Sequence, residues 1–283
     1  MPRPMLRPPR DKIDVLISTL FSIIWTDVGN DRTVWKGSAI WYEGQEYGRR
    51  PLAPEDDSFL RREADIYDRL GEHDRITRSY GLEFKEDGSA AWGLRLERAP
   101  GGALRMYIIN QPPPSFDIRL RMALEFAEGV EHLHARNVRW LDLSTRNALL
   151  FDDLRVKLCD FTGGIVPGIY EKRLMNYELR YTLPESEKDW GPEGSLLREL
   201  FALGTAIYEI TEWRIPYGLD TDELEVEKAL NRGDLPEVSD QNSARSIISR
   251  CWAGDFRSAE HVATKLREMA YTAEEFKLDR LRV

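Results

Sequence analysis

Short apolar runs separated by turn-forming residues make up the first hundred positions of the chain. The β-branched and aromatic residues over 14–36, with a turn at 27–30, predict three short strands, the last over 32–36. Two further runs of the same kind predict strands over 76–84 and 91–97. The first part of the chain is therefore expected to form a β-sheet.

The pattern changes twice between these predicted strands. Residues 43–57 are polar and contain glycine and proline, which predicts a loop. From Ser58 to Leu70 the apolar residues recur at helical spacing, and Gly71 follows them directly. One helix is therefore expected among the strands, ending at this glycine.

The second part of the chain has the periodicity of helices. A proline–glycine break at 99–102 separates it from the strands. Stretches with apolar residues along one side predict helices over 118–135, 196–211, 247–252 and 259–269. Residues 149–151 and 155–158 predict a short hairpin between the first two of these helices.

Strands first and helices afterwards, with a proline–glycine joint between them, predict an α+β fold of two lobes. We expect a small β-rich lobe over residues 11–97, a hinge over 97–102 and a larger, mainly helical lobe over 103–283. Four prolines in residues 1–10 disfavour regular structure, so this segment is expected to be a flexible tail.

Composition narrows the class of protein. With 283 residues, 42% hydrophobic and 31% charged, the chain suits one two-lobed globular domain. A net charge of −9 offers no broad basic surface, so nucleic acid is not an expected partner. The apolar run 16–25 is too short to cross a membrane, and two widely separated cysteines are typical of a reducing compartment. We therefore expect a soluble, intracellular protein, located in the cytoplasm and without a membrane partner.

Two segments carry candidate chemistry. In the segment 140–147, Asp142 is followed five residues later by Asn147, and Asp160 opens the sequence Asp-Phe-Thr-Gly thirteen residues further on. Phosphoryl transfer needs one carboxylate to accept or orient a hydroxyl proton, and oxygen ligands that hold Mg²⁺ on the phosphates. The two aspartates and the asparagine provide these groups in order.

These segments resemble the protein-kinase superfamily, whose catalytic loop reads H-R-D-L-x-x-x-N and whose metal loop reads D-F-G. The resemblance extends from about residue 32 to about residue 267 and implies the two-lobed protein-kinase-like fold. Further segments match the family in order: 94–102 the last small-lobe strand and hinge, 183–185 the end of the activation segment, 201–210 a buried helix, and Arg257 the arginine expected to form a buried ion pair with Glu185.

The resemblance implies a role for each matching residue. Lys36 would contact the α- and β-phosphates of ATP, and Glu63 would hold its ammonium group. Asp142 would be the catalytic base or hydroxyl orienter, and Asn147 and Asp160 would bind Mg²⁺. ATP and Mg²⁺ are thus the expected cofactors.

The adenine ring would be held at the end of the last small-lobe strand. By resemblance, the backbone of Glu97 and Ala99 would bind the ring, and Leu96 would lie at the back of the nucleotide site as the gatekeeper residue.

Four departures from the family pattern bear on activity. The phosphate-covering loop, expected at residues 17–23, contains no glycine, although glycines let backbone N–H groups approach phosphates closely. Trp140 and Leu141 replace the histidine and arginine of the catalytic loop; we expect the tryptophan to replace the packing of the histidine but not its hydrogen bonds. Thr162 replaces the metal-loop glycine, and Glu199 replaces an aspartate that anchors the catalytic loop.

Our leading prediction is ATP- and Mg²⁺-dependent transfer of the γ-phosphoryl group to a hydroxyl of a protein substrate. The alternatives are a pseudokinase that acts as a binding or scaffold module, and a small-molecule kinase. Segment 183–185 and Arg257 favour the protein-kinase branch. Ser144 lies where serine/threonine kinases usually carry lysine, while Arg146 and segment 179–182 resemble tyrosine kinases, so the type of substrate hydroxyl stays open.

Overall fold

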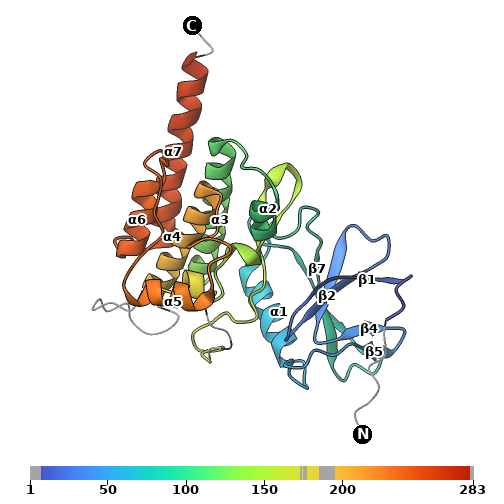
Figure 1. Ribbon diagram of the computed structural model, residues 1–283. Helices are drawn as coiled ribbons and strands as arrows, with labels where there is room; N and C mark the ends of the chain where they lie inside the picture. The colour runs from blue at the N-terminus through green and yellow to red at the C-terminus, as the bar shows by residue number, and fades with distance from the viewer. Residues whose placement is uncertain (1–7, 173, 175–176, 185–194, 281–283) are drawn as a thin grey trace. The chain divides into compact units, whose positions relative to one another are not determined.

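The computed structural model describes residues 8–172, 174, 177–184 and 195–280, with side chains up to residue 271 (Figure 1). The chain divides into two compact units. The described residues up to His73 form one unit together with Thr77–Pro100, and Asp74–Ile76 form the other together with the described residues from Gly101 onward.

A five-stranded antiparallel sheet forms the framework of the smaller unit, with the strand order β1-β2-β3-β7-β6. The strands are β1 (Ile13–Ser18), β2 (Ile23–Asp27), β3 (Thr33–Gly37), β6 (Ser79–Phe84) and β7 (Ala91–Glu97). The strands predicted within 14–36 and over 76–84 and 91–97 are confirmed, and β3 lies at the centre of the sheet. Of the predicted tail, residues 1–7 lie outside the described residues, and the Pro9 carbonyl accepts hydrogen bonds from the amides of Lys12 and Ile13.

The predicted loop over 43–57 is wrong in its first part, because a second hairpin forms there. Strand β4 (Ile40–Tyr42) pairs with β5 (Gln45–Tyr47) around Glu43 and Gly44, which both have positive φ angles, of 47° and 74°. Such a turn matches the twist of a tight hairpin. The hairpin is stabilised by a core cluster on one face of the main sheet, formed by Ile13, Ile23, Trp25 and Ile40 with Trp35, Tyr42, Tyr47 and Trp92 packed against it.

Helix α1 (Ser58–Leu70) packs on the sheet through strands β6 and β7. The predicted helix from Ser58 is confirmed, and it ends at Gly71, whose φ angle is 67° and whose amide donates to the Tyr67 carbonyl. The carboxylate of Asp57, at the start of the helix, accepts a hydrogen bond from the Ala91 amide on β7. The position of α1 against the sheet is therefore set at the start of the helix as well as along its buried side.

The larger unit is mainly helical. Its helices are α2 (Leu104–Asn110), α3 (Phe116–Ala135), α4 (Leu196–Glu212), α5 (Glu223–Asn231), α6 (Arg245–Ala253) and α7 (Ala259–Arg280). The four predicted helices are confirmed, and α2 and α5 are additional. Helix α4 is buried along most of its length and packs closely on α6, where a Cβ atom on Gly204 would lie 2.4 Å from Cβ of Cys251. One unit is thus β-rich and the other mainly helical, which confirms the predicted α+β fold.

Two short strands connect the segments that carry the candidate chemistry. Strand β8 (Ala148–Leu150) pairs with β9 (Val156–Leu158), which confirms the predicted hairpin. Strand β8 begins directly after Asn147, and β9 ends two residues before Asp160. Among the helices described, none is both long and apolar enough to cross a bilayer.

Candidate functional site

A buried ion pair in the smaller unit joins two of the predicted site residues. The Nζ atom of Lys36 on β3 lies 2.7 Å from an oxygen of Glu63 on α1, and the two side chains are only 6% and 1% exposed. A buried ion pair gains little net stability, because desolvation of both charges opposes their attraction. Such a pair in a central position is consistent with a functional role, as the resemblance implies.

The predicted adenine-binding residues follow one another at the end of β7. Leu96 is buried and pairs with Val34 of β3, while Glu97 is the last residue of the strand. The amide of Glu97 donates to the Arg78 carbonyl across 2.9 Å. Ala99 is the second residue beyond the strand and is half-buried. Their role in binding adenine stays a prediction.

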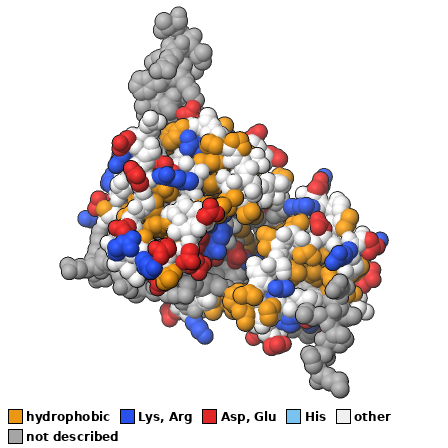
Figure 2. Space-filling model, in the orientation of Figure 1, with side chains coloured by type: hydrophobic (Ala, Val, Ile, Leu, Met, Phe, Trp, Pro, Cys, Tyr) orange, Lys and Arg blue, Asp and Glu red, His pale blue; other side chains and the backbone are white. Residues whose placement is uncertain are grey.

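The turn between β1 and β2 takes the place of a glycine-rich loop, and side chains hold it. The hydroxyl of Thr19 accepts a hydrogen bond from the Ser22 amide, and the Thr19 amide donates to the Ser22 carbonyl, both across 2.9 Å. Arg50 donates to the Thr19 carbonyl from the segment before α1. The turn exposes the large apolar side chains of Leu20 and Phe21, and Figure 2 shows hydrophobic side chains gathered on the visible face of this unit.

The larger unit brings Asp142 and Asn147 into direct contact. The side-chain amide of Asn147 donates to the backbone carbonyl of Asp142 across 2.9 Å and to its carboxylate across 2.8 Å. The amide and the thiol of Cys159 both donate to the Asn147 carbonyl, so the residue before Asp160 is bonded to the asparagine. Cys159 is only partly buried.

The electrostatics of this group fit a cation. Burial raises the pKa of the Asp142 carboxyl, and the nearby charge of Asp160 raises it further, with Arg146 and Asn147 acting in the opposite direction. The described side chains include no cluster of three His, Cys, Asp or Glu residues that could enclose a metal on its own. Mg²⁺ typically takes only one or two carboxylates from the protein and completes its shell with phosphates and water. The carboxylate of Asp160 and the amide oxygen of Asn147 therefore fit Mg²⁺.

Trp140 supplies the hydrogen bond that we expected it to lack. Its indole Nε1 donates to the backbone carbonyl of Asp160 across 2.8 Å. The side chain is fully buried, with ring centroids 5.6 Å from Phe161 and 6.1 Å from Phe126. The expectation that tryptophan replaces only packing is therefore wrong, because the indole N–H reaches the metal-loop backbone.

Glu199 on α4 anchors the catalytic loop despite its additional methylene group. One of its carboxylate oxygens accepts the amide of Leu141 at 2.9 Å, and the other lies 2.6 Å from Nε2 of His134. Leu141 has a φ angle of 64°, a conformation that a branched side chain rarely adopts without such support. His134 on α3 is thus part of this anchor.

The metal loop tolerates threonine in the place of glycine. The left-handed conformation lies at Asp160, with a φ angle of 58°, and Thr162 is not among the residues of positive φ. Thr162 is buried, with 6% of its surface exposed. A Cβ atom at this position is therefore compatible with the backbone.

A carboxylate from the segment after the metal loop joins the catalytic loop, and sequence reasoning missed it. Glu178 lies 3.0 Å from the guanidinium of Arg105 and 3.0 Å from that of Arg146, and it accepts the Ser144 hydroxyl at 2.7 Å. Arg146 also lies 3.5 Å from the carboxylate of Asp142. Arg146 thus contacts both Glu178 and Asp142, the candidate catalytic base.

A deeper layer of polar contacts holds the same loop to α4. The buried carboxylate of Glu209 lies 2.5 Å from Arg105, accepts the Tyr181 hydroxyl at 2.8 Å and accepts the Thr145 hydroxyl. Tyr181 lies in the short 3-10 helix η3 (Leu179–Tyr181). Glu185 lies outside the described residues, so its expected ion pair with Arg257 stays a prediction.

Comparison with known proteins agrees with this arrangement. The family model described as protein tyrosine and serine/threonine kinase matches residues 50–264, which is most of the chain. The chain therefore belongs to the protein-kinase superfamily, as the sequence motifs predicted.

Curated relatives are kinases of modest similarity. Serine/threonine/tyrosine-protein kinase HT1 of Arabidopsis thaliana is 29% identical over 157 residues, 54% of this chain and 40% of the relative. Mitogen-activated protein kinase kinase kinase 20 of the same plant is 28% identical over 211 residues, 69% of this chain and 60% of the relative. RGS domain-containing serine/threonine-protein kinase A of Dictyostelium discoideum is 24% identical over 255 residues, 86% of this chain and 22% of the relative. The matched regions thus span less than two thirds of the length of each of these relatives.

Proposed function

We propose that this chain is an active protein kinase that transfers the γ-phosphoryl group of ATP to a hydroxyl of a protein substrate, with Mg²⁺. The observation that carries the proposal is the contact between Asp142 and Asn147 next to a metal loop whose Asp160 is held by Trp140. We also propose the domain limits predicted from the sequence, with lobes over 11–97 and 103–283, and an intracellular location.

Each residue has a separate task in this proposal. The carboxylate of Asp142 orients the substrate hydroxyl and accepts its proton as the oxygen attacks the γ-phosphorus of ATP, while the bond to the β–γ bridging oxygen breaks and ADP leaves. Asn147 and Asp160 hold Mg²⁺, which neutralises charge on the phosphate oxygens when it is bound. Lys36 binds α- and β-phosphate oxygens, and Glu63 fixes the direction of its ammonium group.

The adenine contacts are part of the same proposal. The backbone of Glu97 and Ala99 would bind the polar edge of adenine, and the buried side chain of Leu96 would restrict the space behind it. These contacts use main-chain groups and so do not depend on the side chains at 97 and 99.

We further propose that the chain needs no activation-segment phosphate. Leu141 removes the arginine that usually receives such a phosphate. Instead, the carboxylate of Glu178 lies among Arg105, Arg146 and Ser144, where it provides a permanent negative charge.

A thermal-shift titration with ATP, with and without Mg²⁺, tests the nucleotide site. Wild-type protein should show a Mg²⁺-dependent rise in melting temperature that Asp160→Asn loses, because a ligand that binds only the folded state stabilises it. A phosphotransfer assay should then show activity that Asp142→Ala removes while the ATP-dependent shift remains. A wild-type protein without any shift at millimolar ATP would contradict the proposal.

The alternative of a pseudokinase scaffold is supported by one observation. The turn between β1 and β2 is held by Thr19, Ser22 and Arg50, so its backbone amides lack the freedom that glycines give a phosphate-binding loop. Under this alternative the thermal shift would be absent in wild-type protein and in Asp160→Asn alike.

A further inference from the structure

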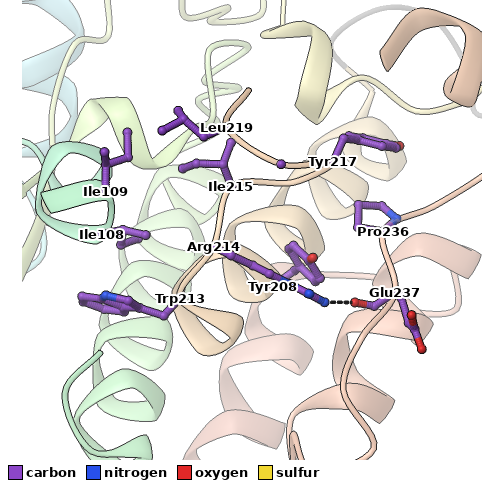
Figure 3. A pocket seen from close by; sticks show the side chains of 11 residues that line it. Ile108, Ile109, Tyr208, Trp213, Arg214, Ile215, Tyr217, Leu219, Pro236 and Glu237 are labelled. Atoms are coloured by element: carbon purple, nitrogen blue, oxygen red, sulfur yellow. Dashed lines mark hydrogen bonds between the residues drawn. The ribbon is translucent and has the colours of Figure 1, made fainter. Parts of the chain in front are cut away.

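The larger unit contains a cavity of about 490 Å³ whose lining includes no residue of the catalytic loop (Figure 3). Ile108 and Ile109 at the end of α2 line it, together with Trp213 directly after α4. Ile215 and Leu219 line it from the loop that follows. This volume lies in the range that accommodates a large side chain or a small ligand.

The walls of this cavity are preformed. Trp213 and Tyr217 have φ angles of 56° and 65°, which is rare for bulky residues and persists only where the surroundings impose it. The indole of Trp213 donates to the Gln111 carbonyl at 2.8 Å, and the hydroxyl of Tyr217 donates to the Asp234 carbonyl at 3.2 Å. Backbone strain of this kind is often found at binding sites.

The guanidinium of Arg214, which lines the wall, already has partners within the protein. Arg214 donates to the Glu237 carbonyl, as Figure 3 shows, lies 3.6 Å from the carboxylate of Glu212, and stacks 5.4 Å from the centroid of the Tyr208 ring. The cavity therefore offers an apolar surface rather than hydrogen bonds for a polar small molecule.

The segment 218–240, which contributes Gly218, Leu219, Pro236 and Glu237 to the lining, is acidic. Residues 218–240 include eight aspartates and glutamates but only two basic residues. Both basic residues have acidic neighbours, since Lys228 lies 2.6 Å from Glu225 and Arg232 lies 2.7 Å from Asp234. The charge of this segment is thus complementary to a basic partner.

The loop that contributes Ile215 and Leu219 to the cavity is hydrogen-bonded to the 3-10 helix η3, and η3 in turn contacts the catalytic loop. Arg180 in η3 donates to the carbonyls of Pro216 at 3.1 Å and Thr221 at 2.7 Å. The next residue, Tyr181, accepts the amide of Thr145 through its hydroxyl at 3.3 Å. A chain seated in the cavity would therefore be held at a fixed position relative to Asp142, which lies on the same loop as Thr145.

We propose that this cavity docks a basic segment of the protein substrate through one large apolar side chain. Its role as a substrate site rests on the proposed kinase function, but binding itself needs no phosphoryl transfer. The apolar walls select the anchoring side chain, and the acidic residues of 218–240 select its flanking lysines or arginines.

The test measures binding without nucleotide. The chain has eight tryptophans, so ¹⁵N-tryptophan labelling gives a small set of indole signals, and Trp213→Phe assigns the one from the cavity wall. The probe is the peptide Lys-Lys-Phe-Lys-Lys, compared with Lys-Lys-Ala-Lys-Lys and Glu-Glu-Phe-Glu-Glu. Titration with the probe should move the Trp213 signal, with affinity at least about tenfold above that of the alanine peptide, because one large apolar side chain is buried.

Two serine variants separate the cavity from the rest of the surface. Leu219 and Leu52 are both 54% exposed, so Leu219→Ser and Leu52→Ser remove similar exposed surface. Only Leu219→Ser should weaken binding of the probe, by about threefold to tenfold. Equal binding of the alanine or the glutamate peptide, equal binding by Leu219→Ser, or no shift at millimolar probe would overturn the proposal.

The same experiment distinguishes docking from catalysis. If the protein binds the probe with these preferences but transfers no phosphate, the docking site is supported and the proposed kinase function is contradicted. If the protein transfers phosphate but does not bind the probe, the proposed kinase function is supported and the docking site is contradicted.

Discussion

The indole nitrogen of Trp140 lies 2.8 Å from the backbone carbonyl of Asp160 and donates a hydrogen bond to it. The tryptophan is fully buried, and the aspartate has a left-handed backbone conformation. The proposed metal-binding residue is therefore held through its main chain by the residue that replaces the histidine of the family motif.

Replacing Trp140 by phenylalanine tests this contact. Trp140→Phe keeps an aromatic ring but removes the indole N–H that donates to the Asp160 carbonyl, so the free energy of unfolding should fall by about 1–3 kcal/mol. The Mg²⁺-dependent shift with ATP should also weaken, because Asp160 loses its support. Trp252→Phe is the matched control, since its buried indole donates to the Thr205 hydroxyl at 2.9 Å and not to the metal loop. Equal loss of nucleotide binding in both variants would contradict the role of Trp140.

The ion pair between Lys36 and Glu63 should be costly to break from one side. Glu63→Ala should lower the free energy of unfolding by about 3–5 kcal/mol, because a buried ammonium group loses the carboxylate with which it forms an ion pair. The double variant Lys36→Met with Glu63→Leu should recover most of that stability and still show no thermal shift with ATP. A double variant that binds ATP as well as wild-type protein would show that the pair serves the fold alone.

Glu178 should contribute to catalysis through Arg146 and the catalytic loop. We expect Glu178→Gln to lower kcat by about tenfold or more, which corresponds to roughly 1.4 kcal/mol of lost positioning, with little change in the KM for ATP. Glu268→Gln is the control, because it removes the carboxylate charge from an exposed ion pair with Lys265 on α7. Replacing the hydroxyl residues of 162–182 by glutamate should not raise activity, since the arginines are already engaged. A strong gain from any of these replacements would refute activation without phosphate.

The charge of Glu178 also predicts a pH dependence of stability. Burial alone would raise the pKa of Glu178, but the charges of Arg105 and Arg146 and the hydrogen bond from Ser144 outweigh it and lower the pKa below the ordinary value of 4.5. The stabilisation is thus fully present above the ordinary pKa and is lost as the pH falls through the lowered pKa of the folded state. In urea unfolding, the stability difference between wild-type protein and Glu178→Gln should be constant from pH 7 to about pH 5 and shrink in more acidic buffer. A difference that grows with acidity would show that the pKa has moved the other way.

Much of the fold could be predicted because it depends on local pattern. Runs of β-branched and aromatic residues predicted the strands of the main sheet, and apolar spacing predicted α1 up to Gly71 and four helices of the larger unit. The spacing of Asp142, Asn147 and Asp160 predicted the kinase family, since the order of these groups along the chain is part of the motif itself. The hairpin of β4 and β5 was missed because its polar residues form strands only when Ile40 and its neighbours pack on the sheet.

The details of the site could be read only from contacts between residues far apart in the chain. Glu178 is 73 residues from Arg105, and His134 is 65 residues from Glu199. No local spacing connects such pairs, because packing of the helices brings them together. The sequence alone was enough to establish the family and the candidate chemistry, since both depend on the order of residue types. The tertiary structure was needed to show that Trp140 donates to the metal loop, that Glu199 reaches Leu141, and that Glu178 lies among arginines, because hydrogen bonds and ion pairs depend on distance in space.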